Sequence, residues 1–267
     1  MKTHVRSFDQ LPTVEQSLRV EGPWRGCFEL DGHHVRCAMD SEEWLHLSVP
    51  LAGNEREWVR RQSGLLLPVK VVAGPKLVAE LPLTDDLAST FCALRAVVRE
   101  ALALLASEGD AVRGVEREDA DLNARLASAV EESAFTWQRD PEHLSTKVGI
   151  ARVVAKASGA SAVFRTNIVR LGQSTGPSLD ALTDFVLAAN ARFRFVRGTF
   201  VPGRLVQEVA WPMAVLTPTL VNRAVRALSD SFRMTKRACA ALVDGHVAEQ
   251  YLEFHRHRKD NHADTDD

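Results

Sequence analysis

The chain has 267 residues, of which 45% are hydrophobic and 25% are charged, and its formal net charge at pH 7 is −2. A near-neutral chain has no general electrostatic attraction to nucleic acid or to an anionic membrane, so we expect neither as a partner. Four cysteines are too few for a dense disulfide framework, and the first residues show no apolar signal segment. We therefore expect a cytoplasmic protein with reduced thiols, long enough for two domains of ordinary size.

The first half predicts a short helix, three strands, a second short helix, a hairpin and a long amphipathic helix. The dipeptide Asp31-Gly32 favours a hairpin between the first two strands, because type I′ turns need positive φ at both positions. Thr84 is expected to cap the long helix, which Gly109 ends, and apolar residues recur in this helix every three or four positions. The other expected elements are helices 11–20 and 54–62 and strands 24–30, 33–39, 44–50, 65–72 and 76–81.

The second half predicts the same order after a charged linker over residues 108–121. Ser178 is expected to cap the middle helix, and Thr217-Pro218 to begin the last one, since proline is well tolerated in the first turn. The polar tail is rich in His and Asp, and we expect it to be disordered. The expected elements are helices 121–130 and 178–189 and strands 135–138, 148–156, 162–171, 193–201 and 204–211.

The two halves also share a sequence repeat. Leu77 and Leu205 lie 128 positions apart, and so do Glu80 and Glu208, within two Gly/Pro-turn segments. A repeat of this length indicates two similar domains rather than a solenoid. We predict an α+β protein with two tandem α-β-β-β-α-β-β-α modules, each an antiparallel sheet with helices packed on one face. The expected parts are residues 1–113, 114–255 and the tail 256–267.

This order of elements resembles the type III secretion chaperone-like fold, which includes Tir-type secretion chaperones and YbjN-like proteins of bacteria. The likeness rests on residues 65–105 and 193–242, where an apolar strand, a Gly/Pro turn, a second strand and a capped helix follow one another. The resemblance implies peptide or protein binding, and a near-neutral chain of double length fits the YbjN-like proteins better. Because family members are homodimers of one module, it also implies a monomeric pseudo-dimer joined through its middle helices or adjoining strands.

A possible metal site lies in the first hairpin, where Cys27, His33, His34 and Cys37 gather four good zinc ligands. Their spacing matches no common zinc template, and neighbouring strand residues point to opposite faces. The alternative interpretation is that the cysteines pack in the core and the histidines face solvent. We expect no bound metal.

Other reactive or basic side chains have ordinary structural interpretations. Cys92 and Cys239 are expected to act as small apolar residues on the long helices. A basic helix with Arg56, Arg60 and Arg61 around Trp58 could bind phosphate or stack on bases, but a solvated basic face around a buried tryptophan is the simpler interpretation. Since no phosphate-loop, zinc-protease or hydrolase motif is present, we expect no cofactor and no catalytic residues.

The sequence therefore predicts a non-enzymatic, chaperone-like protein that binds a peptide or protein client on an open sheet face or edge. Tryptophans on strands are the candidate client-binding residues, because tryptophan is enriched in binding hot spots. These residues are Trp24, Trp44, Trp137 and Trp211. One alternative is a metal-binding or enzymatic protein that uses the Cys27–Cys37 hairpin, and a second is a structural subunit of a larger complex.

Overall fold

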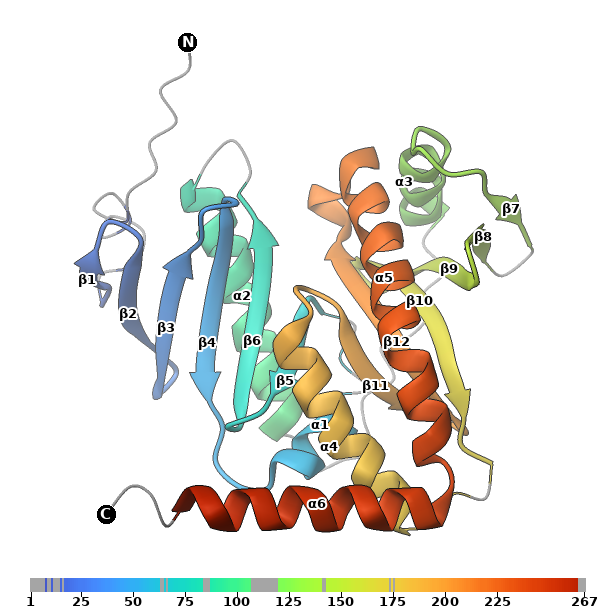
Figure 1. Cartoon of the computed structure of the whole chain (residues 1–267). Helices are drawn as coiled ribbons and strands as arrows, with labels where there is room; N and C mark the ends of the chain where they lie inside the picture. The colour runs from blue at the N-terminus through green and yellow to red at the C-terminus, as the bar shows by residue number, and fades with distance from the viewer. Residues whose placement is uncertain are drawn as a thin grey trace.

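The structure, a computed structural model, describes residues 8, 11, 15, 17–62, 65, 67–83, 87–106, 120–140, 143–172, 174 and 176–263. It confirms the predicted fold class: an α+β protein built from two antiparallel six-stranded sheets with helices packed against them (Figure 1). In the first half the elements are β1 (Arg19–Gly22), β2 (Arg25–Leu30), β3 (His33–Met39), β4 (Trp44–Pro50), α1 (Glu55–Arg61), β5 (Val69–Val72), β6 (Lys76–Pro82) and α2 (Leu87–Ala106).

The second half has the same order of six strands around a middle helix, and its described elements also include α3 and α6. Its elements are α3 (Ala120–Glu131), β7 (Gln138–Arg139), β8 (Leu144–Val148), β9 (Ala151–Ser158), β10 (Ser161–Arg170), α4 (Gly176–Arg192), β11 (Arg197–Val201), β12 (Arg204–Pro212), the short 3-10 helix η3 (Met213–Val215), α5 (Pro218–Leu242) and α6 (Gly245–Ala263). The strand order is β1-β2-β3-β4-β6-β5 in the first sheet and β7-β8-β9-β10-β12-β11 in the second. The two sheets thus have the same topology.

One long helix packs on one face of each sheet. In Figure 1, α2 lies behind β4 and β6, whereas α5 lies in front of β10 and β12. The apolar stripes predicted for both helices are buried, because they supply the helix side of each core. The buried stripe residues are Leu87, Phe91, Leu94, Val98, Leu102 and Leu105 on α2, and Val221, Val225, Leu228, Phe232, Cys239 and Leu242 on α5.

Two turns explain where the strands begin and end. Asp31 and Gly32 both have positive φ (50° and 82°), as the hairpin prediction requires. The sequence predicts one strand over residues 148–156, but Gly149 at φ 58° makes a tight turn with Ile150. This turn separates β8 from β9, and with β1 it gives each sheet six strands rather than the five we predicted.

Several element ends differ from the prediction. Residues 19 and 20, predicted to end the first helix, belong to strand β1, which pairs with β2. Strand β11 begins at Arg197 instead of residue 193, because Phe195 adopts a left-handed conformation (φ 44°). Ser178 lies inside α4, where its hydroxyl donates to the carbonyl of Val243 instead of capping the helix. Thr84 and most of the predicted linker lie outside the described residues.

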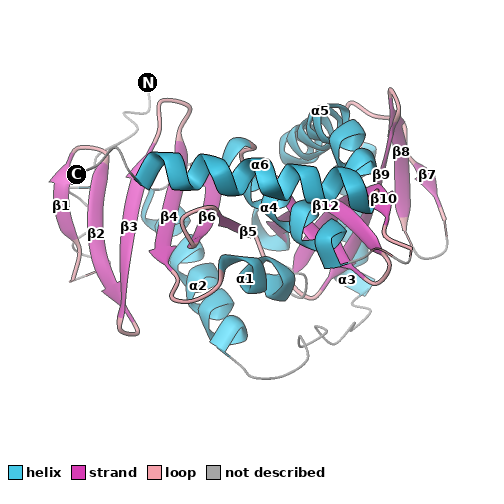
Figure 2. Ribbon diagram, turned by 60° about the horizontal axis from the view of Figure 1, so that its bottom comes forward, coloured by secondary structure: helices cyan, strands magenta, loops and turns pink. Residues whose placement is uncertain are grey.

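The C-terminal segment also differs from the prediction. Helix α6 continues to Ala263, into the residues that we expected to be disordered on account of their polarity. Ala248, Tyr251 and Leu252 recur at helical spacing and pack against the core, and no glycine or proline follows Gly245 in the helix to end it. Figure 2 shows α6 running along one end of the molecule, from the second half toward the first.

Candidate functional site: the junction and the open sheet faces

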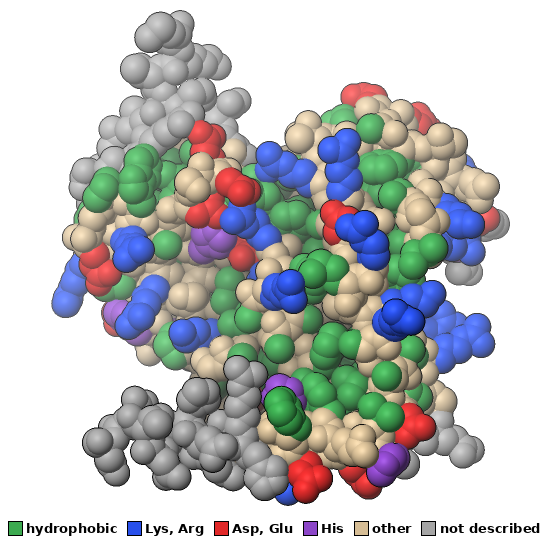
Figure 3. Space-filling view, in the orientation of Figure 1, with side chains coloured by type: hydrophobic (Ala, Val, Ile, Leu, Met, Phe, Trp, Pro, Cys, Tyr) green, Lys and Arg blue, Asp and Glu red, His purple; other side chains and the backbone are tan. Residues whose placement is uncertain are grey.

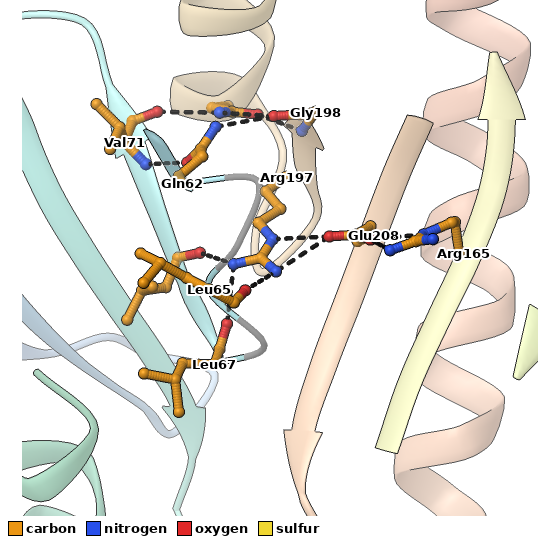
Figure 4. Close-up of polar contacts among 10 residues, drawn as sticks. Gln62, Leu65, Leu67, Val71, Arg165, Arg197, Gly198 and Glu208 are labelled. Carbon is orange, nitrogen blue, oxygen red and sulfur yellow. Dashed lines mark hydrogen bonds and ion pairs between the residues drawn. The ribbon is translucent and has the colours of Figure 1, made fainter. Parts of the chain in front are cut away.

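Two side-chain amides join the halves at the inner edges of the sheets. The Gln62 amide nitrogen donates to the Gly198 carbonyl (2.9 Å), and its oxygen accepts from the Val71 N–H (2.8 Å). The Asn190 amide makes the complementary contacts, since its nitrogen donates to the Val71 carbonyl (3.0 Å) and its oxygen accepts from the Gly198 N–H (2.6 Å) (Figure 4). All four main-chain groups of Val71 on β5 and Gly198 on β11 therefore have partners, and neither strand offers them to a further strand.

A buried ion pair lies beside these amides in the second half. Glu208 on β12, which is fully buried, accepts from the Arg197 guanidinium on β11 (3.0 Å) and from Arg165 on β10 (2.6 Å, Nε to Oε1). The Arg197 guanidinium also donates to the carbonyls of Leu65, Leu67 and Val69 in the first half (Figure 4). One arginine thus neutralises a buried carboxylate and holds the other half of the chain.

The first half contains the equivalent arrangement. Glu80, which is 128 positions before Glu208, accepts from the Lys70 ammonium on β5 (2.8 Å) and lies against His46 on β4 (3.3 Å). Lys70 also donates to the carbonyl of Phe193 in the second half (2.6 Å). Burial alone would raise the pKa of Glu80, but contacts with His46 and Lys70 outweigh it and lower this pKa to about 2. The carboxylate therefore stays ionised at neutral pH.

His46 lies between two carboxylates. Its Nδ1 faces Glu80, and its Nε2 lies 3.0 Å from the Asp40 carboxylate, which also pairs with Arg194 of the second half (2.9 Å). Burial opposes protonation of the ring, but hydrogen bonds with Glu80 and Asp40 outweigh it, so the pKa of His46 is raised. These charges balance one another, which suits a structural role better than proton transfer to a substrate.

An aromatic cluster packs beside the charged groups. The Trp44 ring stacks on Phe195 with centroids 4.9 Å apart, and Trp211 lies 5.2 Å from Phe195. Two guanidinium groups of the second half, from Arg194 and Arg223, lie 5.7 and 5.5 Å from the Trp44 centroid. Figure 3 shows a hollow between the two halves, with charged side chains of both signs beside hydrophobic ones along its walls.

The middle helices meet across the same junction. Arg56 on α1 makes a bidentate contact with Asp184 on α4 (2.6 Å for each bond), and Arg60 pairs with Asp180 (2.8 Å). These arginines, which could have bound phosphate, thus have carboxylate partners. Trp58 is half-buried, and its ring N–H donates to the carbonyl of Ala52 (2.8 Å). The basic helix is part of the junction rather than a free cationic surface.

The structure separates the four candidate tryptophans. Trp44 and Trp211 are buried, with 3% and 0% of their surface exposed, so they are core residues of the junction and present no ring to a client. For Trp44, alternation along the strand could not reveal this, because Phe195, Arg194 and Arg223, which lie against its ring, come from the other half. Trp137 is half-buried and donates to the Ser133 hydroxyl (3.0 Å). Trp24 is 41% exposed and remains a candidate contact.

The Cys27–Cys37 hairpin does not bring its ligands together. Cys27 pairs with Arg36 and Cys37 with Gly26, so the two thiols point to opposite faces of the sheet. Burial raises the pKa of Cys37 to about 12, which keeps it protonated, and His33 and His34 are exposed at the turn. Within the described ranges, no three His, Cys, Asp or Glu side chains are grouped to hold a metal ion.

Both sheets leave one face without a helix. On β2 and β3, Phe28 and its partner Val35 are buried, and Phe28 packs against Phe91 of α2, whereas Glu29, His34 and Arg36 are exposed on the opposite face. The second sheet has the same design, since Gln207 on β12 contacts Ser231 and Thr235 of α5, and the alternate residues point away from that helix. These faces of the outer strands are pleated surfaces that the long helices leave uncovered.

No protein-family model matches the chain, and no curated protein matches it significantly. In the part of the chain that the structure describes, no helix combines the length and the apolar character needed to cross a bilayer.

Proposed function

We propose that this chain is a non-enzymatic, chaperone-like protein that binds a peptide or protein client on the helix-free face of one of its sheets. The observation that carries this proposal is the one-sided covering of both sheets, which leaves exposed side chains on outer strands such as β3 and β8. A pleated face of this kind can accept the side chains of an extended segment.

A sheet face is a better candidate than a sheet edge. The inner edge strands β5 and β11 meet at the junction, where Gln62 and Asn190 occupy the main-chain groups of Val71 and Gly198. The outer edge strands β1 and β7 have only four and two residues, and short edge strands discourage strand addition. The client is therefore expected to lie across the face of a sheet.

The arrangement of the halves also supports a pseudo-dimer role in the manner of YbjN-like proteins. Two modules of equal topology meet through their middle helices, α1 and α4, and through β5 and β11. This junction is made within one chain, so we expect a monomer. We further propose that the protein acts in the cytoplasm, where its four cysteines, all of them free in the structure, would stay reduced.

An array of tiled peptides tests this function, with binding of the labelled intact protein as the readout. We expect a subset of peptides to bind, and we expect their binding to weaken in Arg36→Glu or Lys147→Glu, which alter the two helix-free faces. The matched control is Arg237→Glu on the exposed side of α5, which should bind as the wild type does. Absence of any bound peptide, or equal binding by all three variants, would overturn the proposal.

A further inference from the structure

The helix-free face of the second sheet contains two pairs of like charges in direct opposition. Arg170 on β10 faces Arg204 on β12, and Lys147 on β8 faces Arg152 on β9. All four side chains are exposed. Directly opposed like charges destabilise an antiparallel pair, so two such pairs on one sheet need an explanation beyond stability.

Strand register places all four cations on the same face. Arg204 lies four positions before Glu208 on β12, so the two side chains point to the same face. Glu208 is directly opposite Arg165. Arg165 is in turn opposite Val154 on β9, and Arg152, two positions before Val154, points to the same face as Val154. Residues directly opposite each other share a face, so the four cations point away from α5.

The four side chains also form a staggered row. They come one each from the consecutive strands β12, β10, β9 and β8, in the order Arg204, Arg170, Arg152 and Lys147. Since neighbouring strands lie about 4.8 Å apart, the row spans roughly 15 Å perpendicular to the strands. Continuing the register of β9 and β10 places Arg152 opposite Asn167, three residues before Arg170 and across the β10 bulge, so the Lys147/Arg152 pair is displaced along the strands from the Arg170/Arg204 pair. The row lies at the end of the sheet where the turns 149–150 and 202–203 connect the strands.

Little negative charge offsets this row. Arg152 contacts the Asp140 carboxylate at 3.4 Å, and Asp140 is shared with His143. In the described part of the chain, no carboxylate pairs with Lys147, Arg170 or Arg204. Glu208 on the same face is fully buried and already neutralised by Arg197 and Arg165. The row is therefore a local positive surface on a chain whose net charge is −2.

We propose that this cationic row binds an acidic segment of a polypeptide client, which would remove the repulsion within both pairs. In an extended segment, every second side chain faces the same way at intervals of about 7 Å, so two or three carboxylates can reach the row at once. The proposal rests on the client-binding function above and adds the chemistry of the client. A polypeptide suits the surface better than nucleic acid, because the four cations have no exposed aromatic residue between them on which bases could stack.

Fluorescence anisotropy with a labelled peptide of alternating Glu and Ala tests the proposal, with the Gln/Ala peptide as its neutral counterpart. We expect the acidic peptide to bind about tenfold more tightly or better, and to lose that advantage as salt rises from about 50 to about 300 mM. The double variants Arg170→Gln/Arg204→Gln and Lys147→Gln/Arg152→Gln should each weaken acidic binding by about tenfold. The control Arg226→Gln/Arg237→Gln on α5 removes the same charge and should not.

Urea unfolding without peptide provides a second readout. Both pair variants should unfold at the same or a higher urea concentration than the wild type, because each removes a repulsion. Acidic binding that survives both variants, or falls equally in the α5 control, overturns the proposal. Tighter binding of a single-stranded oligonucleotide overturns it in favour of nucleic acid. Binding of neutral and acidic peptides alike refutes the acidic preference alone, whereas failure of every peptide refutes the client-binding function as well.

Discussion

Gln62 and Asn190, which lie 128 positions apart in the chain and in different halves, hydrogen-bond to the same two residues. Each side-chain amide bridges Val71 and Gly198, and together they use both main-chain groups of both residues. Lys70 and Arg197 act in a similar way, each neutralising a glutamate in its own half and donating to a carbonyl of the other. The halves are therefore joined by buried reciprocal hydrogen bonds.

Removing one of the amides should destabilise the whole fold. Asn190→Ala leaves the Val71 carbonyl and the Gly198 N–H without these partners in a buried site, which should lower the free energy of unfolding by about 1–3 kcal/mol. Urea unfolding followed by circular dichroism measures the change. Gln138→Ala, at an exposed residue of β7, is the control and should change stability little. A loss at Asn190 no larger than that of the control would contradict this role.

Glu208 should be the most sensitive charged residue. Glu208→Gln leaves the buried Arg197 guanidinium without its carboxylate, and breaking a buried ion pair from one side costs about 3–5 kcal/mol. Chemical unfolding of this variant and of Glu253→Gln, an exposed residue of α6, gives the comparison. If both substitutions have effects below about 1 kcal/mol, the ion pair does not support the junction as described.

The halves could be predicted from the sequence, but their junction could not. The shared offset of Leu77 with Leu205 and of Glu80 with Glu208 predicts two similar modules, and the sheets confirm their equal topology. The same offset relates Gln62 to Asn190, a signal that the sequence reasoning missed. Nothing in local periodicity shows that β5 and β11 meet, and only that contact gives these polar residues partners.

The two buried cations do not occupy equivalent positions of the repeat. Lys70 corresponds to Gly198 at the common offset, whereas Arg197 corresponds to Val69, so the two cations occupy neighbouring rather than identical positions. A Cβ atom at residue 198 would lie 3.1 Å from the Val186 side chain, which favours glycine there. The two halves thus neutralise their equivalent buried glutamates with cations from different positions of the repeat.

His46 should make stability depend on pH. Folding raises its pKa above the unfolded value of about 6.5, so the contacts with Glu80 and Asp40 stabilise the fold fully below that pH. This contribution is lost as pH rises through the higher pKa of the folded state. His46→Gln should therefore flatten the decline in stability above about pH 6.5, as measured by thermal unfolding across pH. An unchanged slope in the variant would show that His46 does not titrate with folding.

The thiols should differ sharply in reactivity. Cys92 is exposed on α2, whereas Cys27, Cys37 and Cys239 are buried, and burial raises the pKa of Cys239 to about 12. Titration of the native protein with an aromatic disulfide reagent should label Cys92 rapidly and the other three only after unfolding. Cys92→Ser should abolish the rapid phase. Rapid labelling of Cys27 or Cys37 would contradict the packing of the first hairpin.

Photo-crosslinking tests the central claim, that a client lies on a helix-free sheet face, most directly. A benzophenone amino acid would replace Arg36, Lys147 or Arg237 in turn, and each protein would be irradiated with the peptide that binds most tightly. We predict that the peptide forms an adduct at Arg36 or Lys147 and none at Arg237 on α5. Efficient adducts at Arg237, with none on either sheet face while binding persists, would contradict the account.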